Sequence, residues 1–153
     1  MIDHYTLFYY EFINGKRHSK NYWQAMQGRP QHNTWCGLAF ERVCLWHIDQ
    51  IKMKLGISGV LTDEYAWRCL PDKKTGRKGV QIDLLIDRSD GIIDLCEMKY
   101  SKKEYAITEN YEKELIQKKS VFMEVTQTKK RCSYHHDNFQ WVNTQCLYRR
   151  NPK

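Results

Sequence analysis

The chain has 153 residues and a formal net charge of +7, with 41% hydrophobic and 28% charged residues. These values are ordinary for one globular domain with a hydrophobic core. The sequence lacks a run long enough to span a membrane and the apolar segment of a signal peptide, and its six cysteines include no CxxC pair. We therefore expect a cytoplasmic protein without a membrane partner, a disulfide framework or a zinc ribbon. The positive charge is compatible with a polyanionic partner.

Residues 1–30 form an aromatic-rich N-terminal segment. Residues 5–10 fit either a strand or a buried helical turn, because periodicity does not separate the two. Asn14 and Gly15 predict a turn. The aromatic rings could stack on bases, but rings of this kind more often pack. We expect the segment to contact whatever precedes or covers it; its rings are Tyr5, Phe8, Tyr9, Tyr10, Phe12, Tyr22 and Trp23.

A helix is predicted from Asn33 or Thr34, either of which can cap it, to Leu55. Glu41 lies on the apolar stripe of this helix, where a carboxylate needs a partner. Its alternative role is that of a flank residue bonded to Arg42 or another surface cation. The stripe is formed by Leu38, Leu45, Ile48, Ile51 and Leu55, with Cys44 beside them.

Residues 60–70 read as a first strand, and a basic, glycine-bounded loop follows at 71–79. The cations of this loop are placed to touch phosphates, although a plain solvated hairpin loop is equally consistent with the pattern. They are Lys73, Lys74, Arg77 and Lys78.

Residues 81–87 and 92–99 predict two strands joined by the Asp90-Gly91 turn of a hairpin. Alternation along the first strand places Ile82, Leu84 and Ile86 on one face and Asp83 on the other. In the second strand Glu97 and Lys99 are two residues apart, so they project side by side. Charges in apolar strands must compensate one another or hold a metal. A structural ion pair among Asp83, Glu97 and Lys99 is the alternative interpretation.

A last helix is predicted from the Thr108 cap to about Val125, with an apolar face of Tyr111, Leu115 and Phe122. The opposite face carries Glu112, Lys113, Lys118 and Lys119, and Glu114 and Lys118 form an i,i+4 pair.

Asp83 followed by Glu97-x-Lys99 across a hairpin resembles the PD-(D/E)XK nuclease superfamily. The resemblance implies an α/β (α+β) fold with an αβββα(β) core, in which helices flank a mixed sheet. It further implies that Asp83 and Glu97 ligate Mg²⁺ or Mn²⁺, that Glu41 completes the site, and that Lys99 polarises the attacking water.

The segments 33–41, 47–52, 56–60 and 81–87 are similar to the PD-(D/E)XK-like C-terminal domain of a family of AAA-type ATP-binding proteins. This likeness covers about residues 1–131. It implies that 1–30 is a linker from a missing ATPase domain and that 31–131 is the nuclease-like domain. The sequence has no Walker-type loop, so we expect no ATPase activity from this chain.

Residues 132–153 form an atypical tail. If the codons are shifted forward by one base, Tyr134, His135, Asp137 and Asn138 become Ile or Thr, and His136 becomes Met or Thr. Such residues favour a strand. We therefore hypothesise that a frameshift changed the tail, so that the last strand of the fold is lost or altered. A zinc site formed by Cys132, His135, His136 and Cys146 is the alternative, but its spacing matches no established motif.

The sequence thus predicts a Mg²⁺- or Mn²⁺-dependent phosphodiesterase acting on DNA, with the ATPase domain as partner. The alternatives are a non-catalytic module that docks on the ATPase or binds nucleic acid, and a truncated fragment without function.

Overall fold

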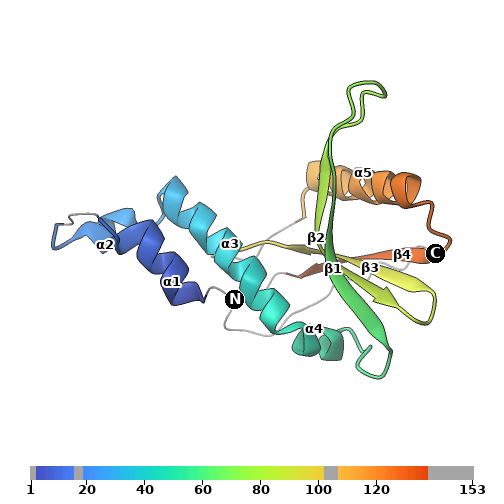
Figure 1. Cartoon of the computed structure of the whole chain (residues 1–153), viewed down its shortest axis with the longest axis horizontal. Coiled ribbons are helices and arrows are strands. Elements are labelled where there is room, and N and C mark those ends of the chain that lie inside the picture. Colours follow the sequence, from blue (N-terminus) through green and yellow to red (C-terminus); the bar gives the residue numbers. More distant parts are fainter. Residues whose placement is uncertain (1–2, 16–18, 102–106, 138–153) are drawn as a thin grey trace.

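The computed structural model describes residues 3–15, 19–101 and 107–137, with only the backbone at 135–137. Its centre is a four-stranded mixed sheet in the order β1-β2-β3-β4 (Figure 1). The strands are β1 (Thr62–Cys69), β2 (Val80–Arg88), β3 (Ile92–Met98) and β4 (Arg131–Asp137). The first three pair antiparallel, and β4 runs parallel to β3.

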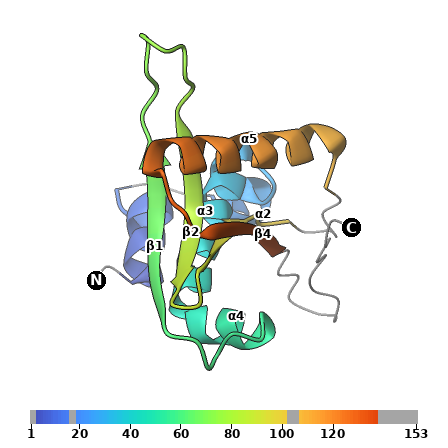
Figure 2. The same cartoon turned by 90° about the vertical axis from the view of Figure 1, so that its right-hand side faces the viewer.

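Three helices flank the sheet: α3 (Pro30–Trp46), α4 (Ile48–Lys54) and α5 (Glu109–Thr126). The predicted mixed α+β class with flanking helices is therefore confirmed. Figure 2 shows α5 and α4 on opposite sides of β3 and β4.

Each face of the sheet has its own apolar core. On the side of α3 and α4, Cys44, Ile51 and Ile57 pack against Leu84, Ile86, Cys96 and Met98. On the side of α5, Phe122 and Cys132 pack against Ile82, Leu85, Ile93 and Leu95. The sheet is thus buried on both faces along β2 and β3, so any charged group there needs compensation.

The last strand was expected to be lost or altered, and its loss is wrong for residues 131–137. These residues pair with β3 from Ile92↔Arg131 to Met98↔Asp137. Cys132 is buried, and Tyr134 packs against the core on the α5 side. The packing of Cys132 and Tyr134 and the pairing of every residue with β3 stabilise this strand despite its polar composition. The frameshift hypothesis for the rest of the tail, and the zinc site through Cys146, fall on residues outside the described part.

A bulge in β2 changes which side chains share a face. Tyr65 pairs with Leu85 and Trp67 with Ile82, so Ala66 alone lies opposite Asp83 and Leu84. An extra residue shifts the alternation by one. The prediction that Ile82 and Leu84 share a face is therefore wrong, because they belong to the two different cores.

The structure has two helices where one was predicted over residues 33–55. The first, α3, begins at Pro30, and α4 follows it after His47, whose dihedral angles are not helical. Proline at the first helical position explains the earlier start, since its missing N–H has no partner there anyway. The break changes the direction of the chain, and Ile51 of α4 is buried. Leu38 and Leu45, predicted on the apolar stripe, are exposed.

The N-terminal helices α1 (His4–Phe8), η1 (Tyr9–Ile13) and α2 (Tyr22–Met26) form an aromatic cluster with α3. Phe8 and Phe12 contact Trp23 and Trp35 at centroid distances of 5.2 to 5.7 Å. These rings therefore pack against one another and against α3, as expected of most rings in this segment. Tyr5 and Tyr10 of the same segment are exposed.

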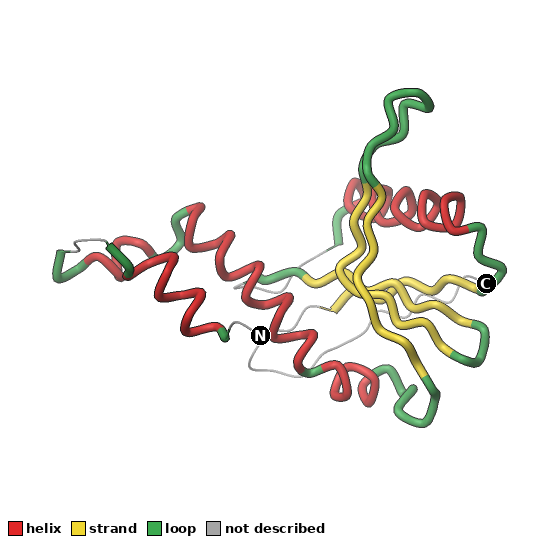
Figure 3. Tube along the Cα trace, viewed as in Figure 1, coloured by secondary structure: helices red, strands yellow, loops and turns green. Residues whose placement is uncertain are grey.

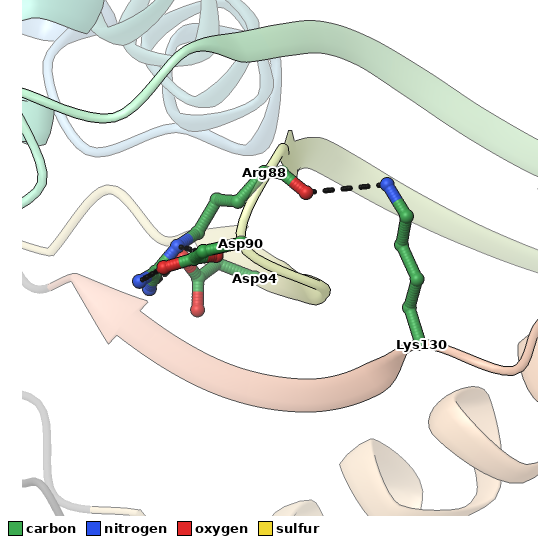
Figure 4. A network of polar contacts seen from close by, with 4 residues as sticks. All are labelled: Arg88, Asp90, Asp94 and Lys130. Atoms are coloured by element: carbon green, nitrogen blue, oxygen red, sulfur yellow. Dashed lines mark hydrogen bonds and ion pairs between the residues drawn. The ribbon is translucent and has the colours of Figure 1, made fainter.

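The β2–β3 hairpin turn is held by charged contacts (Figure 4). Arg88 pairs with Asp90 and, at 3.2 Å, with the buried Asp94, and Lys130 donates to the Arg88 carbonyl at 3.2 Å. Gly91 has φ +84°, as the predicted turn requires. This network lies at the end of the hairpin away from Asp83.

Candidate functional site

Asp83, Glu97 and Lys99 meet where β2 begins and β3 ends. Asp83 is the third residue after the start of β2, within the bulge, and its Oδ2 accepts a hydrogen bond from the Met98 N–H at 2.9 Å. Bulges are common beside functional sites because they re-aim a side chain. This contact ties the acid of one strand to the backbone beside Glu97 and Lys99.

Glu97 is almost completely buried, with 1% of its side chain exposed. Its Oε2 lies 2.8 Å from Lys118 Nζ of α5, and its Oε1 has no hydrogen-bond partner among the described residues. Burial raises the pKa of Glu97, and the charge of Asp83 adds to this, while Lys118 and Lys99 oppose it. A buried carboxylate oxygen without a partner is costly unless something binds it.

Glu41 lies on α3 and is influenced by the charges of Asp83 and Lys99. Burial raises its pKa first, and the charge of Asp83 raises it further, while Lys99 and Arg42 lower it. Glu41 and Lys99 also line one open pocket of about 560 Å³, together with Gly28, Asn33, Gly37, Met98, Tyr100 and Ser101. Asp83 and Glu97 do not line this pocket.

Lys99 lies one residue beyond β3 and is half-buried. Its Nζ is 5.4 Å from the centroid of the Tyr111 ring on α5, close enough for a cation–π contact. Lys99 is therefore held at the site by an aromatic face, and its charge acts on both Glu41 and Glu97.

Carboxylate oxygens are suitable ligands for a hard divalent cation, but those of Glu41, Asp83 and Glu97 do not surround a single position. No three His, Cys, Asp or Glu residues in the described ranges are arranged as ligands of a single ion. Mg²⁺ is commonly held by only one or two carboxylates and keeps several waters. Asp83 and the free Oε1 of Glu97 offer such oxygens, with Glu41 close enough for its pKa to respond to Asp83.

The basic loop between β1 and β2 projects beyond α5 as an arm, residues 70–79 (Figure 3). Its Lys73, Lys74 and Lys78 are exposed. Arg77 is half-buried and lies 3.9 Å from Glu124 of α5, so it is less available than the lysines. The arm leads directly into the part of β2 that carries Asp83.

Sequence reasoning missed Lys118 and Tyr134. Lys118 was predicted to lie on the solvent side of α5 with Glu114, which it does approach at 4.0 Å, but its closer partner is Glu97. The signal was available, since position 118 follows Leu115 by three and precedes Phe122 by four. Tyr134 pairs with Leu95, two residues before Glu97, and its hydroxyl is buried without a hydrogen-bond partner among the described residues. Burial and the charges of Glu97 and Asp83 raise its pKa. Its strand was not expected.

No family model, curated protein or solved structure matches the chain. Within the described residues, no helix has the length and apolar character needed to cross a bilayer.

Proposed function

We propose that the chain carries a metal-dependent phosphodiesterase site acting on DNA, in a PD-(D/E)XK-like domain. The observation that carries this proposal is the meeting of Glu41, Asp83, Glu97 and Lys99 from separate segments at one end of the sheet. Burial raises the pKa of Glu41 and of Glu97, and the charges of Asp83 and Lys99 act on both carboxyl groups; such perturbed groups are common in functional sites.

Asp83 and Glu97 would hold Mg²⁺ or Mn²⁺, and Glu41 would complete or adjust the site. A bound cation supplies an activated water and neutralises charge on the phosphoryl oxygens. Lys99 orients the attacking water and stabilises the negative charge that develops on the phosphate. The Met98 N–H keeps the Asp83 carboxylate oriented toward this end of β3.

The arm would position the DNA. Its exposed lysines lie in the loop that continues into β2, the strand that carries Asp83, so the arm would hold a duplex close to that strand. Phosphate contacts of this kind give affinity without sequence preference. The net charge of +7 agrees with such a partner.

The test is cleavage of linear, supercoiled and single-stranded DNA with Mg²⁺ or Mn²⁺ and with a chelator. Lys99→Ala and Asp83→Ala should each abolish metal-dependent cleavage in a folded protein. Lys113→Ala is the matched control, because Lys113 lies on the surface of α5 and pairs with Glu109. Cleavage that survives both site substitutions contradicts the proposal.

A non-catalytic module is the second candidate. The contact of Lys118 with Glu97 favours it, because it satisfies one oxygen of the buried carboxylate without a metal. Such a module would bind nucleic acid or dock on an AAA-type ATPase domain through exposed aromatic residues such as Tyr5 and Tyr10. A salt-sensitive gel shift that Asp83→Ala leaves unchanged, without cleavage, supports this candidate over the nuclease.

A further inference from the structure

Lys118 is part of the site although it belongs to the helix on the opposite side of the sheet from Glu41. Its side chain is 16% exposed, and its ammonium lies 2.8 Å from the Oε2 of a carboxylate that is 1% exposed. An unpaired charge at such a depth is strongly unfavourable, so the ammonium supplies the compensation that Glu97 needs. Lys118 therefore supplies positive charge where the proposed function requires a divalent cation.

Lys118 contacts Oε2 of Glu97, and a divalent cation would bind the free Oε1 of the same carboxylate. Mg²⁺ binds carboxylate oxygens at about 2.0–2.1 Å, so it would lie close to the ammonium, and the two positive charges would repel each other. Asp83 and Lys99 also act on Glu97, and Tyr134 from β4 lies beside it. A cation that enters this cluster must therefore weaken the contact between Lys118 and Glu97.

Lys118 has a second carboxylate within reach. Oε1 of Glu114, one helical turn earlier on α5, lies 4.0 Å from its Nζ and belongs to a side chain that is 57% exposed. A small rotation of the lysine side chain would move its charge from the buried acid to this exposed one. The helix needs no rearrangement for this exchange.

We propose that Lys118 is a resident counter-cation of Glu97, which a divalent metal displaces toward Glu114 when it binds. This inference rests on the proposed metal site. It assigns Lys118 a positioning role: its ammonium holds the buried carboxylate in place without metal, and it raises the metal concentration at which the site fills.

The first test is a calorimetric titration of the full chain with Mn²⁺, at the same pH for every variant. Lys118→Met should bind Mn²⁺ about tenfold more tightly than the wild type. Lys118→Gln, which keeps a hydrogen-bond donor, should change the affinity in the same direction. Lys113→Met is the matched control, because it removes an exposed lysine of the same helix, and its affinity should equal that of the wild type.

The second test uses the unmutated chain and so does not depend on a variant that folds. Mg²⁺ should shift the side-chain NMR signals of Lys118 and leave those of Lys113 unmoved. If the chain binds Mg²⁺ but Lys118 does not respond, or if the Lys118 variants bind Mn²⁺ no more tightly, the counter-cation role is refuted. Loss of binding in Asp83→Asn would then still support the metal site, whereas absence of binding in every form refutes both.

Discussion

Asp83 has two separable roles, and two substitutions distinguish them. Asp83→Ala removes both the charge and the acceptor of the Met98 N–H, whereas Asp83→Asn removes the charge and keeps an acceptor oxygen. A hydrogen bond to a charged group contributes about 1.5–3 kcal/mol. Because Asp83 is half-buried, we take the lower end, and relief of its repulsion with Glu41 and Glu97 offsets part of the loss.

We therefore expect Asp83→Ala to lower the free energy of unfolding by about 1 kcal/mol. With an m-value of about 2 kcal/mol per molar urea, the midpoint falls by about 0.5 M. Asp83→Asn should unfold at or above the wild-type midpoint. Circular dichroism in urea measures both.

Mn²⁺ affinity is the second readout for the same pair of variants, and both should lose at least about tenfold. Asp63→Asn, on the exposed side of β1, is the matched control and should keep the wild-type affinity. If Asp83→Asn binds Mn²⁺ as tightly as the wild type, Asp83 is not a ligand. If Asp83→Ala and Asp83→Asn have equal midpoints, the hydrogen bond with Met98 does not stabilise the fold.

Three further outcomes are expected. Replacing Lys73, Lys74 and Lys78 of the arm together by Gln should flatten the log–log salt dependence of DNA binding by about 0.9 for each phosphate that the arm no longer neutralises, and an unchanged slope places the DNA elsewhere. Phe122→Ala should lower the free energy of unfolding by about 3–5 kcal/mol, measured in urea, because Phe122 is 2% exposed in the core under α5. Burial raises the pKa of Glu97 above 4.5, so the folded state binds the Glu97 proton more tightly than the unfolded state does. Protonation therefore stabilises the fold at low pH, and this stabilisation is lost as the pH rises through the folded pKa. Glu97→Gln should remove that fall from the pH dependence of the melting temperature above pH 4.5, and an unchanged profile contradicts the raised pKa.

The elements of the fold could be predicted where the pattern was local. The β2–β3 hairpin follows from two apolar runs around Asp90-Gly91, and α5 begins after Thr108, whose side chain accepts from the Tyr111 N–H as a cap should. These signals involve residues close together in the chain, so no tertiary information is needed.

The errors arose where tertiary structure decides. Strict alternation of side chains cannot predict the bulge at Asp83. Because of the bulge, Ile82 lies in the core under α5 and not, as was predicted, on the same face as Leu84. The strand at 131–137 is stabilised by its pairing with β3 rather than by its own propensity. Both features lie at or beside the site, where local rules are commonly broken.

The family resemblance predicted the grouping of Glu41, Asp83, Glu97 and Lys99, and the charges of Asp83 and Lys99 do act on the pKa of both Glu41 and Glu97. The contact of Lys118 with Glu97 was not expected, because lysine on a helix is assumed to face water. Its position within the buried stripe of Tyr111, Leu115 and Phe122 is the observation that should have outweighed its charge.

The most direct test of the site is paramagnetic broadening by Mn²⁺ in NMR spectra of the full chain. Substoichiometric Mn²⁺ should first remove the amide signals around Glu41, Asp83 and Glu97, while those of the β2–β3 turn remain. Uniform broadening, or broadening centred on another part of the chain, would contradict a metal site at this end of the sheet.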